Sequence, residues 1–114
     1  MNKSLLYCIL IFTITQVVIW FQTNGQFISD WYKNNVFLVS LAGIPISYGY
    51  IYATKFGFEA FDSSLWSVRL LCFALGTIIF AIMTYIIMGE GISYKNMTSL
   101  LLAICLILIQ LFWK

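Results

Sequence analysis

Four long apolar stretches, separated by short segments that hold nearly all the charged residues, constrain the fold more than any other feature of this sequence. They run from about residue 4 to 21, 36 to 53, 65 to 88 and 97 to 113. A helix needs about 20 mostly apolar residues to cross the hydrocarbon core of a membrane. Arg69 is the one charged residue that lies within a stretch. The pattern predicts an all-α membrane protein with four transmembrane helices.

The composition excludes the other broad classes. Of the 114 residues, 62% are hydrophobic and only 9% are charged, whereas soluble domains carry roughly 25% charged residues. An aromatic content of 18% is far above that of disordered chains. A net charge of +2, spread along the chain, supplies no basic face for nucleic acid. We therefore expect the chain to be embedded in a lipid bilayer.

The stretches are continuously apolar, which favours helices over barrel strands, because barrel strands alternate polar and apolar residues. Four spans use most of the chain, so residues 1–114 form a single domain with loops at about 22–35 and 54–64. The first stretch could instead be a cleaved signal peptide. It ends in Ile19-Trp20-Phe21-Gln22, which offers no small-residue cleavage site, so we expect a retained helix.

The distribution of lysine and arginine gives a weak orientation signal. The side that holds both termini and the second loop carries four basic residues, and the other side carries Lys33 and Lys95. By the positive-inside rule this favours both termini in the cytoplasm, in an inner or plasma membrane. So small a difference also permits insertion in both orientations.

Polar residues inside the spans are the natural candidates for function, because an unpartnered polar group is costly in lipid. Gln16 lies mid-span in the first stretch, Ser47 in the second, and Arg69 and Thr77 in the third. Each has a structural alternative: interhelical hydrogen bonds for the neutral groups, and for Arg69 either extension to the headgroups or pairing with Glu59 or Asp62.

Pro45 predicts a kink in the second span, since proline removes a backbone donor and clashes with the preceding turn. Small residues at Ala74, Thr77 and Ala81, and at Ser99 and Ala103, recur at helical spacing and favour close packing of helices.

Catalytic and metal-binding patterns are missing. The chain has no histidine, and its three cysteines fall in three different spans without a short spacing, so we expect no metal site and no cofactor. No nucleophile–base pair or phosphate-binding glycine loop is visible, so an enzyme is not expected.

Residues 77–112 read TIIFAIMTYIIMGEGISYKNMTSLLLAICLILIQLF, an apolar helix that ends in Gly89-Glu90, a short polar loop and a final apolar helix. This stretch resembles the end of a repeat in the drug/metabolite transporter superfamily, and the length and four spans resemble its small multidrug resistance branch. The essential glutamate in the first helix of that branch is absent, since Ile14, Thr15 and Gln16 occupy the region. An anionic or lipid-linked cargo, as in the flippase branch, is therefore expected rather than a cation.

The resemblance implies that four helices form half of a working unit, in which two halves pair with inverted topology. The partner is then a second copy or another small membrane protein, and alternating access would use the kink at Pro45 around a cavity lined by Gln16, Ser47, Arg69 and Thr77. The main alternative is a structural or accessory subunit that packs against a larger membrane complex through its small-residue stripes.

Overall fold

Four long helices make up most of the computed structural model, which describes residues 3–113. The long helices are α1 (Lys3–Asn24), α4 (Gly43–Ala60), α5 (Leu65–Met83) and α6 (Tyr94–Phe112). Two short helices, α2 (Asp30–Asn34) and α3 (Val36–Ser40), follow a 3-10 turn at Gly25–Phe27, and a π-helical turn at Thr84–Met88 extends α5. The described residues contain no strand. The predicted all-α, four-helix fold is confirmed.

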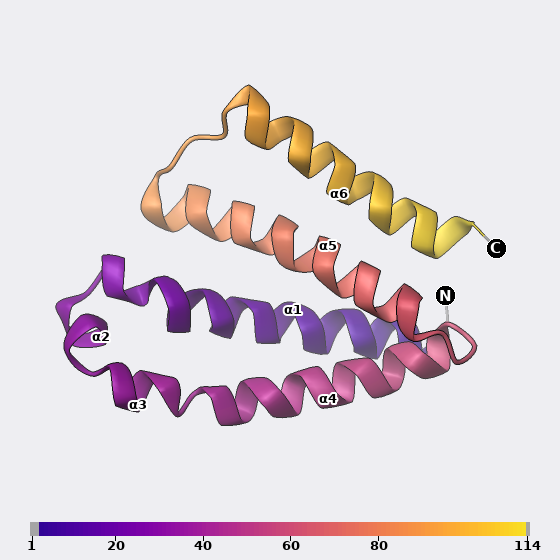
Figure 1. Ribbon diagram of the computed structural model, residues 1–114, viewed down its shortest axis with the longest axis horizontal. Coiled ribbons are helices and arrows are strands. Elements are labelled where there is room, and N and C mark those ends of the chain that lie inside the picture. Colours follow the sequence, from indigo (N-terminus) through magenta and orange to yellow (C-terminus); the bar gives the residue numbers. More distant parts are fainter. Residues whose placement is uncertain (1–2, 114) are drawn as a thin grey trace.

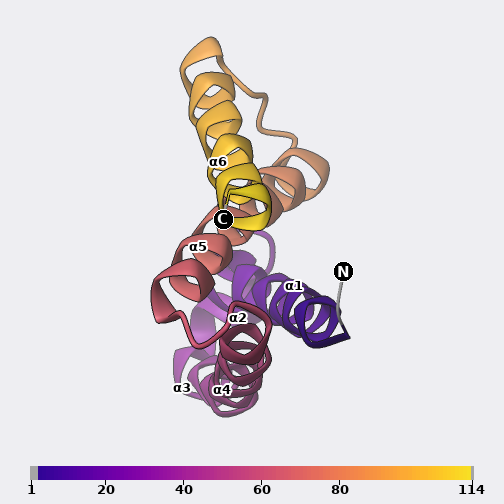
Figure 2. The same cartoon turned by 90° about the vertical axis from the view of Figure 1, so that its right-hand side faces the viewer.

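The long helices lie side by side in one layer, in the order α4, α1, α5, α6 (Figure 1). The molecule measures 47 × 36 × 18 Å, so the layer is roughly one and a half times as thick as one helix with its side chains. The last helix, α6, packs mainly against α5 and stands away from α4 (Figure 2). Both broad faces of the layer are therefore uncovered.

The helices α1 and α4 form the tightest pair because two glycines of α4 allow close approach. A Cβ placed on Gly49 would overlap the Thr15 hydroxyl of α1, and one on Gly57 would lie 3.0 Å from the Cys8 Sγ. Phe12 and Tyr50 add an edge-to-face ring contact at 5.3 Å between centroids. Small residues at such crossings are the usual means by which membrane helices associate.

The second span is longer than the sequence pattern suggested. The structure continues α4 to Ala60, so the expected loop at 54–64 is wrong over its first seven positions. The two charged residues of α4, Lys55 and Glu59, are both exposed at the end of the helix. Glu59 also accepts a hydrogen bond from the Ser4 hydroxyl of α1 at 3.2 Å. The remaining turn ends at Ser64, which caps α5 by accepting from the Ser67 amide.

The same span is interrupted one turn before Pro45, at Leu41 and Ala42, between α3 and α4. Pro45 has no amide hydrogen to donate to the Leu41 carbonyl, which instead accepts from the Ile44 amide at 3.2 Å. The Val39 carbonyl accepts from the Ala42 amide at 3.1 Å and also from the Gln22 side chain of α1 at 3.3 Å. The break is therefore tied to α1 by a side chain.

The surface is that of a protein in lipid. The chain exposes 7930 Å², whereas a compact soluble monomer of this length exposes about 6,400 Å². Large apolar side chains dominate this surface on all four long helices, including Phe73 (65% exposed) and Leu102 (65%). All four spans are long and apolar enough to cross a bilayer. The chain is a multi-pass membrane protein, and α1 begins at the end of the layer where α6 ends (Figure 1).

Candidate functional site

A groove between α1, α4 and α5 brings together three of the four polar residues singled out from the sequence. This central groove has a volume of about 380 Å³, and its polar lining consists of Gln16, Tyr50, Arg69 and Thr77. The aromatic rings of Phe12, Phe73 and Phe80 complete much of the wall. The groove thus combines one positive charge with an amide, two hydroxyls and an apolar lining.

Gln16 is fixed in position by contacts with both neighbouring helices. Its Nε2 donates a hydrogen bond to the Tyr50 hydroxyl of α4 at 2.9 Å. On the other side the amide packs closely against Gly76 of α5. A Cβ added to Gly76 would lie only 3.2 Å from the Oε1 of Gln16. The absence of a side chain at Gly76 therefore makes room for the amide. Gln16 links three helices at the floor of the groove.

Arg69 is the single charged side chain in the lining of the central groove. It lies one turn into α5, is exposed, and has no ion pair within residues 3–113. The carboxylates considered as partners from the sequence do not neutralise it, since Glu59 bonds Ser4 instead. An unneutralised arginine at this depth is unusual in a membrane helix and favours an anionic ligand or partner.

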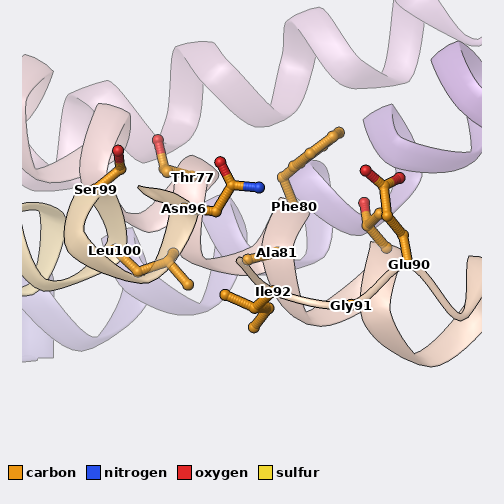
Figure 3. A pocket seen from close by; sticks show the side chains of 10 residues that line it. Thr77, Phe80, Ala81, Glu90, Gly91, Ile92, Asn96, Ser99 and Leu100 are labelled. Atoms are coloured by element: carbon orange, nitrogen blue, oxygen red, sulfur yellow. The ribbon is translucent and has the colours of Figure 1, made fainter. Parts of the chain in front are cut away.

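A second groove, between α5 and α6, begins where the central groove ends. This lateral groove has a volume of about 240 Å³ and shares Thr77 and Phe80 with the central groove. Its other polar side chains are those of Thr84, Glu90, Asn96 and Ser99. In Figure 3 the Phe80 side chain projects between the Asn96 amide and the Glu90 carboxylate, on the same side of the helices.

The Gly89-Glu90 motif positions the one carboxylate of the lateral groove. Gly89 has a left-handed conformation (φ 69°), and its amide donates to the Tyr85 carbonyl at 3.2 Å, which ends the helix. Glycine adopts this conformation without the steric cost that other residues carry. The chain then turns, and the following residue, Glu90, lines the groove mouth.

Ser47 is not part of either groove. It is exposed on α4, and the buried face of that helix is formed instead by Ile46, Ala53 and Gly57. Pro45 is also exposed. The α4 residue that contacts α1 in the site is Tyr50. It was not among the site residues predicted from the sequence. Its position four residues after Ile46 and seven before Gly57 is the helical spacing that could have identified it.

A further interhelical hydrogen bond ties α1 to the π-helical turn. The Trp20 Nε1 donates to the Thr84 hydroxyl at 3.0 Å, and Thr84 lines the lateral groove. Trp20 and Gln16 lie one turn apart on the same face of α1. Gln16 lines the central groove, and Trp20 bonds Thr84, which lines the lateral groove.

Metal-binding geometry is not found in the described part of the chain. No group of three or more His, Cys, Asp and Glu side chains lies close enough to hold a metal ion there. Cys8 and Cys72 are buried and Cys105 is exposed, and all three are free thiols.

Comparisons with other proteins add no family assignment. No protein family model, curated protein or solved structure matches this chain.

Proposed function

We propose that this protein is one half of a dimeric transporter that moves an anionic, lipid-linked metabolite across the membrane. The observation that carries the proposal is the central groove, in which Arg69 is the one charged lining residue and has no ion pair within residues 3–113. A guanidinium binds phosphate and carboxylate groups through paired hydrogen bonds. The Tyr50 hydroxyl and the Thr77 hydroxyl add neutral hydrogen-bonding groups elsewhere in the lining of the same groove.

The openness of the layer supports a cargo with a lipid tail. The lining side chains Arg69, Phe73 and Phe80 are exposed, so the central groove is open at the surface of the layer. A polar head could enter this groove from the side while its hydrocarbon chain stays among the lipids. The aromatic wall of Phe12, Phe73 and Phe80 suits the boundary between head and chain.

Three features support a paired, alternating-access unit. Transport sites in such proteins lie between repeats, and a single layer encloses no site by itself. The break at Leu41–Ala42 supplies a point at which the second span can bend. The weak lysine and arginine bias permits a partner of inverted orientation, either a second copy or another small membrane protein.

The transport of lipid is testable in sealed vesicles. Purified protein is reconstituted with phosphatidylglycerol that carries a nitrobenzoxadiazole fluorophore on one acyl chain, and dithionite bleaches the outer leaflet. We expect the bleached fraction to rise from about one half toward completion with protein present, and phosphatidylcholine with the same label to move at least several-fold more slowly. A rate equal to that of protein-free vesicles for both lipids contradicts the proposal. A soluble anionic fluorophore trapped in the lumen distinguishes lipid movement from a leak.

One observation favours an accessory subunit as the second candidate. The helix α6 packs mainly against α5 and leaves most of its surface exposed, as a docking helix does. However, the predicted stripe on α6 faces inward, since Ala103 is buried within the chain. Purification in mild detergent separates the candidates: a homogeneous dimer supports the transporter, and recovery only with a larger membrane protein supports the subunit.

A further inference from the structure

Two of the three cysteines lie next to each other where α1, α4 and α5 meet. Cys8 of α1 is fully buried, and Cys72 of α5 is 8% exposed. A Cβ on Gly57 of α4 would lie 3.0 Å from the Cys8 Sγ and 2.9 Å from a Val68 methyl group of α5. Cys72 follows Val68 by one turn on the same buried face of α5, and the two thiols form a hydrogen bond with each other. The pair therefore bridges the contact between α1 and α5.

The two thiols differ in their access to the central groove. Cys72 belongs to the groove lining, together with Arg69, which lies one turn earlier on α5. Cys8 is not part of the lining and is completely enclosed. Reactive thiols in proteins are partly accessible and lie near a positive charge, and Cys72 meets both conditions. A molecule in the groove can thus reach Cys72 first, and Cys8 is the thiol that can attack the Cys72 sulfur afterwards.

The position of the pair selects a lipid-soluble oxidant. The two cysteines lie within the spans Lys3–Phe27 and Leu65–Met88, and the groove beside Cys72 has an aromatic wall. Charged oxidants such as glutathione disulfide are costly to transfer into such surroundings. Quinones dissolve in lipid, accept two electrons, and present a flat ring with two carbonyl acceptors. The Tyr50 hydroxyl accepts from the Gln16 side chain and keeps its own hydrogen to donate to such a carbonyl.

We propose that Cys8 and Cys72 form a redox-active dithiol that a lipid-soluble quinone oxidises to an internal disulfide. The Cys72 sulfur adds to the quinone ring, and its proton passes to one quinone oxygen. The Cys8 sulfur then attacks the Cys72 sulfur, the bond from Cys72 to the ring breaks, and the electron pair stays with the ring. The Cys8 proton passes to the second oxygen. Two thiols and one quinone thus become one disulfide and one hydroquinone.

The disulfide also regulates transport, and this part of the inference rests on the proposed function. The new bond fixes α1 to α5 at the wall of the central groove, one turn from Arg69. Two helices that line the groove then lose their freedom to move past each other. We expect the oxidised protein to move labelled phosphatidylglycerol several-fold more slowly than the reduced protein, and dithiothreitol to restore the rate.

A thiol count after exposure to decylubiquinone tests the pair. Protein in bilayers is reduced, freed of reductant and incubated with decylubiquinone without oxygen. It is then denatured and labelled with a maleimide for mass spectrometry. We expect the wild-type chain to lose two of its three free thiols, Cys8 and Cys72, with one molecule of decylubiquinol formed per chain. Cys105→Ser should lose both of its remaining thiols.

The single variants of the pair are the matched controls. Cys8→Ser and Cys72→Ser each lack one member of the pair, so both should keep their remaining thiols and form no decylubiquinol. Cys105 is exposed on α6 and reports on a thiol that is accessible without a resolving partner. Monodisperse elution and wild-type helical circular dichroism confirm that each variant is folded. Glutathione disulfide should leave the pair reduced, and oxidation by it at the rate of decylubiquinone would contradict a lipid-soluble oxidant.

Two results overturn the inference: all three thiols of folded wild-type protein survive decylubiquinone, or the single variants lose thiols as fast as the wild type. If the disulfide forms but oxidised and reduced protein transport lipid at equal rates, the redox pair stands and its effect on transport is rejected. If the reduced wild-type chain transports no lipid while the disulfide forms, the redox pair stands and the proposed function is rejected.

Discussion

Replacing Gly49 by leucine should abolish the folded four-helix layer. A Cβ at this position would overlap the Thr15 hydroxyl and lie 3.1 Å from the Thr15 Cβ and Cγ2, so α1 and α4 have to separate. Even one inserted methyl group in a tight contact costs roughly 1–3 kcal/mol, and leucine adds four carbon atoms. The yield of monodisperse protein in mild detergent, with its thermal unfolding, measures the loss.

Gly91 provides the matched control, because a Cβ there has no neighbour within 4 Å. Gly91→Leu should leave the yield and the unfolding temperature near wild type. Gly49→Ala should be intermediate, and Thr15→Ala in that background should recover part of the loss by removing the hydroxyl and methyl group. Wild-type yield from Gly49→Leu would show that α1 and α4 do not pack as described.

Replacing Arg69 by glutamine should reduce the movement of labelled phosphatidylglycerol at least ten-fold. The substitution removes the one charged group in the lining of the central groove and keeps a polar, shorter side chain there. A ten-fold loss corresponds to about 1.4 kcal/mol, which is modest for a charge-assisted hydrogen bond to an anion. Arg69→Lys keeps the charge without the paired donors and should retain an intermediate rate.

Lys55→Gln is the control for net charge, because Lys55 is also exposed near the same end of the layer but lies outside the groove. Its rate should stay within about two-fold of wild type. Equal rates for wild type and Arg69→Gln would remove Arg69 from the transport mechanism.

The sequence predicted the number of helices and most of their bounds, because the need for about 20 apolar residues per crossing leaves few alternatives. It missed the extension of α4 to Ala60, since charge was taken to mark a loop. Lys55 and Glu59 stay helical because the end of a span reaches the interface, where long side chains extend to water.

The structure places three of the four polar residues selected from the sequence in one groove. Gln16, Arg69 and Thr77 line one groove because they lie on the faces of α1 and α5 that approach each other. Ser47 does not join them, since the close contacts of Gly49 and Gly57 set the rotation of α4 and leave Ser47 exposed outside the groove. Which face a mid-membrane serine presents depends on such packing, and hydropathy carries no information on it.

The two grooves and the charged residue in the lining of each could not be predicted from the sequence either. Gly89-Glu90 was noted as a motif, but only the fold shows that Glu90 and Arg69 border grooves that share Phe80. A linear reading places them in separate elements, 21 positions apart. Because α5 lies between α1 and α6 in the layer (Figure 1), it contributes to both grooves.

The orientation of the copies in one membrane tests the central claim, a four-span chain that works as an inverted pair. In protein without its native cysteines, Ile28→Cys and Ser63→Cys mark the loops at opposite ends of the layer. We predict that an impermeant maleimide labels about half the copies at each position in cells or natively inserted vesicles, and the remainder only after permeabilisation. Complete labelling of one position from outside, with complete protection of the other, would contradict the account.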